Sequence, residues 1–286
     1  MPTTFPLPRK PQITRDLNII SDITVQDLEH RYQQFISCEF FVNDFIVHDP
    51  VQFPRRFLTA RKNRRAGIEI AAFLAATIAW GRRDLIIRSA ERMFALMEGG
   101  PETFVLEGGY RKLKGRMGDS GLRDPGRLRG PCLHRTFFEG DLYYFCRGFH
   151  HCYAKYGSLE KLFAAAPDVW QGIALFREEM AAANGGIFSK HIANPGNSAC
   201  KRIHLALRWL VREGPVDTGL WKSIKPSALF IPLDIHVART ARKLGLLSRK
   251  SNDKKAVVEL TEKLQEFCPK DPVKYDFALF GMGLNS

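Results

Sequence analysis

The amino-acid sequence predicts an all-α protein of two helical lobes with a cleft between them. Apolar residues recur every three or four positions in one segment after another, which is the period of an amphipathic helix. No alternating strand pattern of useful length interrupts these segments. A stretch rich in glycine and arginine at about 108–131 separates an earlier from a later group of helices, and we interpret it as a surface insert at the boundary of the lobes.

The charge of the chain is its most unusual bulk property. The 286 residues include 43 Lys and Arg against 30 Asp and Glu, a formal net charge of +13. A positive field of this size favours nucleic acid or an anionic membrane as partner; a merely soluble basic protein is the alternative. No segment approaches the ~20 apolar residues that span a bilayer, and the N-terminus has no apolar signal core, so we expect no membrane association.

The six cysteines are widely scattered along the chain. They include no pair at zinc-ligand spacing and no cluster of four that could hold iron and sulfur. We therefore expect reduced thiols in a cytoplasmic protein, with no metal and no iron–sulfur cluster.

The first half of the chain begins with a proline-rich segment, residues 1–24, which we expect to be an irregular arm preceding one domain over 25–286. Val25 to Phe41 has the spacing of an amphipathic helix. The segment from Ile68 to Trp80 is apolar almost all round, which predicts a buried helix. Gly81 ends that segment, and Asp84 can cap a further helix that runs to Met97.

Helix start signals recur in the second half of the chain. Expected helices run from Gly140-Asp141 to Tyr156, from Leu159 to Ala166 and from Asp168 to Ala183. Asn252 or Asp253 can cap another that ends at Phe267, and Asp271-Pro272 introduces the last one.

The stretch from Ser198 to Leu247 carries the residues with most chemical potential. It predicts a helix, a connector with Gly and Pro, and a second helix that opens at Asp234. The first helix carries a basic stripe at i+3 and i+4 spacing, formed by Lys201, His204, Arg208 and Arg212. A lysine, a carboxylate and an arginine-rich surface together indicate chemistry on a polyanion.

The segment PLDIHVARTARKLGL resembles the helix that carries the catalytic aspartate in helix-hairpin-helix DNA glycosylases, typified by endonuclease III. The family's Asp-x-His-x-x-Arg pattern is matched here by Asp234, His236 and Arg239. IEIAAFLAATIAWGRRDLIIRSAERMF resembles the early helix pair of that superfamily, whose turn, here Trp80 to Arg83, approaches the DNA. The C-terminal third is most similar to an uncharacterised bacterial family related to archaeal 8-oxoguanine glycosylases.

In those archaeal enzymes the lysine precedes the aspartate by a longer interval than usual, and here Lys201 and Asp234 are 33 positions apart. The chain departs from the superfamily in three respects. The common Leu-Pro-Gly-x-Gly hairpin is replaced by GPVDTGLWKSIKPSALFIP, the position 18 before the aspartate is Val216, and the iron–sulfur cysteines are missing.

The resemblance implies a base-excision repair glycosylase with abasic-site lyase activity, acting as a monomer on a damaged base, such as an oxidised purine, in double-stranded DNA. It would be nucleoid-associated when bound. Lys201 would be the nucleophile, although a solvated lysine is the alternative, and Asp234 would stabilise positive charge at C1′ while capping its helix. The residues expected to contact DNA are Trp80, Arg82, Arg83, His204, Arg208, Arg212, His236 and Arg239, with Trp80 or Arg82 as the wedge. A noncatalytic DNA-binding protein that keeps the fold is the alternative function.

Overall fold

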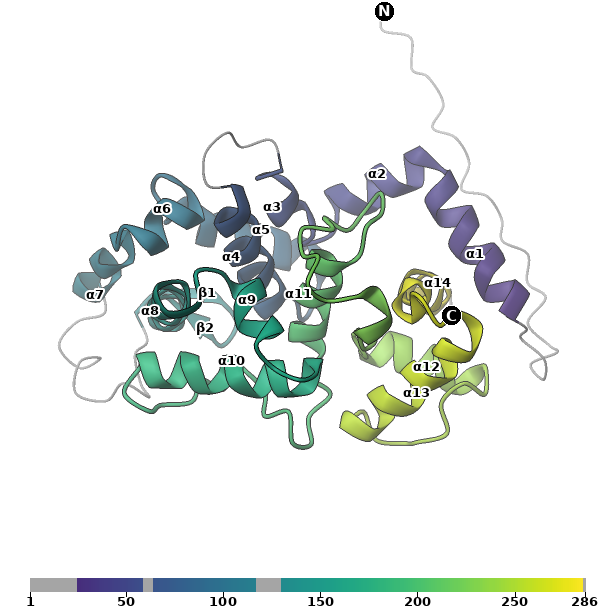
Figure 1. Cartoon of the computed structure of the whole chain (residues 1–286). Helices are drawn as coiled ribbons and strands as arrows, with labels where there is room; N and C mark the ends of the chain where they lie inside the picture. The colour runs from purple at the N-terminus through teal and green to yellow at the C-terminus, as the bar shows by residue number, and fades with distance from the viewer. Residues whose placement is uncertain (1–24, 59–63, 117–129, 285–286) are drawn as a thin grey trace, which may run out of the picture.

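The structure, a computed structural model, describes residues 25–58, 64–116 and 130–284. Helices dominate these residues, and they are accompanied by one two-stranded antiparallel sheet (Figure 1). The all-α prediction is therefore confirmed. None of the helices in the described ranges is long and apolar enough to cross a membrane.

The elements follow one another from a long N-terminal helix to a C-terminal one. The earlier ones are α1 (Val25–Ser37), α2 (Glu39–Val47), α3 (Gln52–Arg55), α4 (Arg64–Thr77), α5 (Arg83–Ala95), α6 (Gly100–Leu106), η1 (Gly109–Arg111), α7 (Lys112–Arg116), β1 (Cys132–His134) and β2 (Phe137–Phe138). The later ones are α8 (Glu139–Tyr156), α9 (Leu159–Ala164), α10 (Val169–Ala183), α11 (Lys201–Val211), η4 (Pro226–Ala228), α12 (Ile235–Lys243), α13 (Lys254–Phe267), η5 (Pro272–Tyr275) and α14 (Asp276–Leu284).

The helices form two groups with α11 between them (Figure 1). On one side, α8 packs against α9 and α10, and α4 packs against α3 and α6. On the other side, α1 and α12 both pack against α14. Because α11 also packs against α4, the first residues of α11 come close to the end of α4 and the turn that leads into α5.

Aspartates cap the first turns of three helices whose starts the sequence predicts. Asp168, Asp234 and Asp253 are N-caps whose carboxylates accept backbone N–H groups of the first turn. Asp84 is not a cap, contrary to expectation: Arg82 occupies the N-cap position of α5, and the Asp84 carboxylate pairs with Arg82 and Arg88.

The structure departs from the prediction most clearly in three features. The helix expected over 25–41 is broken at Cys38, where the backbone is extended. The small β1–β2 sheet was not predicted, because its strands are too short to show alternation. The expected surface insert begins as helix, with Tyr110 and Leu113 buried, while 117–129, like the arm at 1–24, lies outside the described residues.

The prediction of a buried helix is confirmed. From Ile68 to Ala76, α4 is almost completely shielded from solvent. It also carries a buried carboxylate, Glu69, which accepts hydrogen bonds from the Trp221 indole at 2.8 Å and the Leu159 backbone N–H at 3.0 Å. These contacts fasten the connector between α11 and α12, as well as the start of α9, to the central helix.

Three residues of the predicted basic stripe on α11, His204, Arg208 and Arg212, do not lie on the protein surface. This corrects the expectation that they form an exposed face for DNA. All three side chains are buried, with 1–3% of each residue exposed. His204 packs against Trp170 and Phe230, and burial lowers its pKa to about 3, so its ring is neutral.

The two buried arginines are neutralised inside the protein. Arg208 pairs with Asp276 and lies 3.4 Å from Asp217, and Arg212 pairs with Asp217 and Asp271. These ion pairs connect α11 to the connector that follows it and to the C-terminal helices.

Replacing Arg212 by alanine should lower the free energy of unfolding by about 3–5 kcal/mol, because removing one partner leaves buried carboxylates without their counter-charge. Arg239→Ala on the exposed face of α12 is the matched control, with an expected change within about 0.5 kcal/mol. Urea denaturation of the three proteins measures both effects. Equal, small losses for the two variants would contradict the assigned role of Arg212.

Candidate functional site

Lys201 and Asp234 lie side by side at the starts of α11 and α12. The Lys201 Nζ is 3.7 Å from Asp234 Oδ2 and donates a hydrogen bond to the Ala79 carbonyl at 3.2 Å. Both side chains are partly shielded, with 30% of the lysine and 18% of the aspartate side chain exposed. The two helix starts therefore meet, as the hairpin-like connector predicted.

The connector achieves this without the glycine-rich hairpin of the superfamily. After α11 the chain turns back, and the N–H groups of Thr218 and Trp221 bond to the carbonyls of Trp209 and Leu210 at 2.7 and 2.8 Å. Leu229 and Ile231 are then buried on the way to α12. Backbone pairing and apolar anchors thus set the position of Asp234.

The two oxygens of Asp234 face different groups. Oδ1 accepts the backbone N–H groups of His236 and Val237 at 2.9 and 2.8 Å, which caps α12 and fixes the carboxylate. Oδ2 faces Lys201. One aspartate can therefore both cap its helix and act on the lysine, and the two predicted roles are geometrically compatible.

The backbone is strained immediately before Lys201 and in the β1–β2 turn. Among the described residues, only Cys200 and Arg135 have a positive φ without being glycine, at 45° and 54°. Such conformations cost about 1–3 kcal/mol and cluster at functional sites. Cys200 immediately precedes Lys201, and Arg135 forms the turn between β1 and β2 beside Gly81.

A cavity of about 930 Å³ opens beside Lys201 and Asp234. Its walls come from the end of α2, the α4–α5 turn, the β1–β2 turn, α11, α12 and α14. The charged residues that line it are Asp49, Arg82, Arg83, Arg135, Lys201, Arg208, Asp234 and Asp276, and the aromatic ones are Phe45, Trp80, Phe277 and Phe280 with His134 and His236. The cavity thus combines apolar and aromatic walls with many charged groups, and ligand sites likewise join apolar walls to polar groups that orient the ligand.

Two carboxylates in this cavity, Asp49 and Asp276, are not among the site residues that the sequence predicts. Burial raises the pKa of Asp49 above its usual value, and burial raises that of Asp276 to about 6 although Arg208 opposes the shift. Asp276 follows a proline-started turn and opens an otherwise apolar helix, which is the one signal that the sequence offers for it. Carboxyl groups whose pKa values are raised by burial in a cavity are typical of functional sites.

The turn from Trp80 to Arg83 lines the cavity, but its side chains differ in availability. The Trp80 ring packs edge-on against His134 and stacks on His191, with centroids 4.8 and 5.9 Å away. Of the two predicted wedges, Arg82 is therefore the one that projects, with 76% of its side chain exposed. Arg83 instead lies over the Phe280 ring at 4.5 Å, 3.6 Å from Asp49.

The remaining predicted contacts lie on α12. His236 lines the cavity, with its ring centroid 6.4 Å from that of Phe280. Arg239 is exposed one turn further along. Among the described residues, no group of three or more His, Cys, Asp or Glu side chains is arranged to hold a metal ion.

Comparison with known proteins gives one match. Residues 49–285 match a family described as "Protein of unknown function (DUF2400)", and because this range covers most of the chain, the protein belongs to that family. The range includes every residue of the cavity except Phe45. No curated protein and no solved structure matches the chain.

The raised pKa of Asp276 predicts a pH-dependent stability. Below about pH 6 the folded protein keeps a proton that the unfolded chain loses near pH 4, so this contribution is present at pH 4 and lost as the pH rises through 6. Asp276→Asn removes the titration. From pH 4 to 7 the wild type should lose up to about 3 kcal/mol relative to the variant. Urea denaturation at each pH measures this, and parallel profiles would contradict the assignment.

Proposed function

We propose that the protein is a DNA base-excision repair glycosylase with abasic-site lyase activity, acting on a damaged base in double-stranded DNA. One observation carries the proposal: a lysine and a carboxylate, 33 positions apart in the sequence, meet at 3.7 Å on the wall of a cavity of about 930 Å³. The family has no described function, so the proposal rests on this geometry and on the resemblance of the two helix starts.

The chemistry assigned to the pair is nucleophilic. After its proton passes to solvent, the Lys201 amine attacks C1′ of the sugar, the C1′–N bond breaks, and its electron pair leaves with the base, which takes up a proton from solvent. The sugar ring then opens to give a Schiff base on Nζ, from which loss of a proton at C2′ expels the 3′-phosphate and cleaves the strand. Asp234 stabilises the positive charge that develops at C1′ and orients the lysine, and its cap bonds hold it in place.

The cavity is suited to a base removed from the helix. Flipping a nucleotide costs a few kcal/mol of stacking and pairing, which apolar contact and hydrogen bonds in a pocket offset. Phe45 and Phe280 supply aromatic walls, and Asp49 and Asp276 supply carboxyl groups that can bond the polar edge of a base. We propose this cavity as the base pocket.

The surface around the cavity is suited to the duplex. Arg82 and Arg135 line the cavity and are exposed, and Arg239 is exposed on α12, in a chain of net charge +13. These cations can bind phosphates and hold the strand while the base is turned out. This set replaces the buried α11 arginines as the proposed DNA contacts.

A noncatalytic DNA-binding protein with the same fold is the second candidate. Asp234 argues against it, because a carboxylate at the DNA-facing surface opposes binding of a polyanion. The same carboxylate is useful when positive charge develops at C1′.

Lys201→Gln and Asp234→Asn separate the two assigned roles. Lys201→Gln should abolish strand cleavage and borohydride trapping on abasic DNA while affinity stays within a few-fold, because one of 43 basic residues is lost. Asp234→Asn should slow base release strongly while binding DNA as well or better. Asn caps a helix nearly as well as Asp, so the fold should be kept.

The assay is single-turnover excision on duplexes that carry different lesions, scored for abasic sites and for strand breaks. Lys114→Gln, on the exposed surface of α7, is the control for loss of a lysine. Folded variants that excise at the wild-type rate would show that Lys201 and Asp234 are structural.

Duplex binding should depend steeply on salt. If several exposed arginines contact phosphates, affinity should fall by orders of magnitude between ~50 and ~200 mM salt. Arg239→Ala should weaken all duplexes similarly and lower the salt slope by about one, because phosphate contacts carry no sequence information. Fluorescence anisotropy titrations measure both quantities, and salt-insensitive binding would contradict the proposed partner.

A further inference from the structure

A second, smaller cavity adjoins the first on the other side of Lys201. It has a volume of about 470 Å³, and its walls come from the α4–α5 turn, the β1–β2 turn, the segment before α11, the first residues of α11 and Asn252. It shares Ala79, Trp80 and Lys201 with the larger cavity, so the lysine stands in the wall between the two.

The two cavities differ in charge. The larger one contains the carboxylates of Asp49, Asp234 and Asp276 together with several cations. Of the described residues that line the smaller one, none is acidic, whereas Lys190, Lys201 and Arg202 are cationic. Thr136, Ser198 and Asn252 add groups that can donate hydrogen bonds. Such a lining favours an anion.

Among the residues that line this cavity, Arg202 is the best placed to bind an anion. Its Nη1 donates to the Thr77 carbonyl at 2.9 Å, and its guanidinium lies 5.1 Å from the Trp80 ring centroid. No carboxylate of the described residues forms an ion pair with it, and burial lowers its pKa. Arg202 is half-buried, and because it has no carboxylate partner among the described residues, its remaining donors are suited to a negatively charged group.

The position of this cavity identifies the class of anion. We propose that the smaller cavity binds a phosphodiester group next to the nucleotide whose base enters the larger cavity, through Lys190 and Arg202. This inference rests on the proposed function, because a sugar attacked by Lys201 lies at the shared wall. Its base extends from C1′ to one side, and its phosphates extend from C3′ and C5′ to the other.

Neutral methylphosphonates test the subsite. The ligands are duplexes with a tetrahydrofuran abasic analogue, which the enzyme cannot process, and one methylphosphonate at each flanking position in turn. At one phosphate beside the analogue, the substitution should weaken wild-type binding about tenfold, the effect of losing one hydrogen bond to a charged group. Lys190→Met and Arg202→Met should each lose a similar factor on the unmodified duplex.

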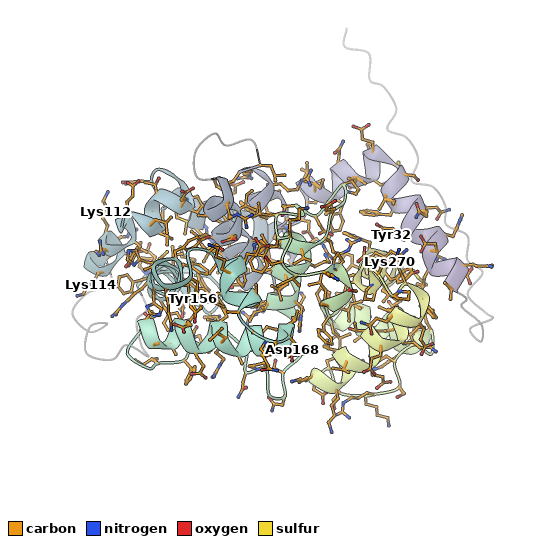
Figure 2. The ribbon with its side chains drawn as sticks, viewed as in Figure 1. Tyr32, Lys112, Lys114, Tyr156, Asp168 and Lys270 are labelled. Atoms are coloured by element: carbon orange, nitrogen blue, oxygen red, sulfur yellow. The ribbon has the colours of Figure 1, made fainter. Side chains whose placement is uncertain are left out.

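The decisive result is the combination of the two changes. At that one phosphate the methylphosphonate should cost the Lys190→Met and Arg202→Met proteins clearly less than it costs the wild type, because one of the two charged contacts is already gone, while elsewhere the losses should multiply. The control is Lys114→Met, whose lysine lies at the outer end of the molecule away from α11 (Figure 2), and its losses should multiply at every position.

The outcomes separate this inference from the proposed function. If the losses of affinity from the variant and from the methylphosphonate multiply at every position for both variants, the subsite is overturned. If the wild type nevertheless prefers the abasic duplex, the proposed function still stands. A wild type with no such preference would contradict both. Lys190 is exposed, so its variant gives a result even if Arg202→Met, which disturbs the Trp80 contact, fails to fold.

Discussion

The burial of α11 is the constraint on which the rest of the structure depends. This helix packs against α4 and carries two arginines into the interior, where Asp217, Asp271 and Asp276 neutralise them. Buried ions are tolerated only when they are paired, so these contacts fix the connector and the C-terminal helices relative to α11. The position of Asp234 beside Lys201 follows from that arrangement.

The site lies where this constraint brings remote segments together. Lys201 begins α11, Asp234 caps α12, and the α4–α5 turn closes the third side through the Ala79 carbonyl. A nucleophile and a carboxylate placed on helix starts are held more rigidly than on loops, and catalysis depends on such preorganisation. The strained backbone at Cys200 is a further sign that the position of Lys201 is determined by its surroundings.

Much of the fold could be predicted because its signals are local. Asp168 and Asp253 are capping residues that predict the starts of their helices, and the apolar sequence of α4 predicts its burial. The meeting of Lys201 and Asp234 could be predicted from the connector and the resemblance. The burial of Arg208 could not, because its counter-charge Asp276 lies 68 positions away and helical periodicity alone does not separate a solvated charge from a paired one. Asp49 could not be predicted as a site residue either, because its partner Arg83 is also remote in the sequence.

The central claim is that Lys201 is the nucleophile of a glycosylase and abasic-site lyase. The most direct test is to reduce the complex with abasic DNA using borohydride, digest it, and locate the sugar adduct by mass spectrometry. The account predicts an adduct on the Nζ of Lys201. An adduct on a different lysine, or no adduct with an enzyme that is folded and binds abasic DNA, would contradict it.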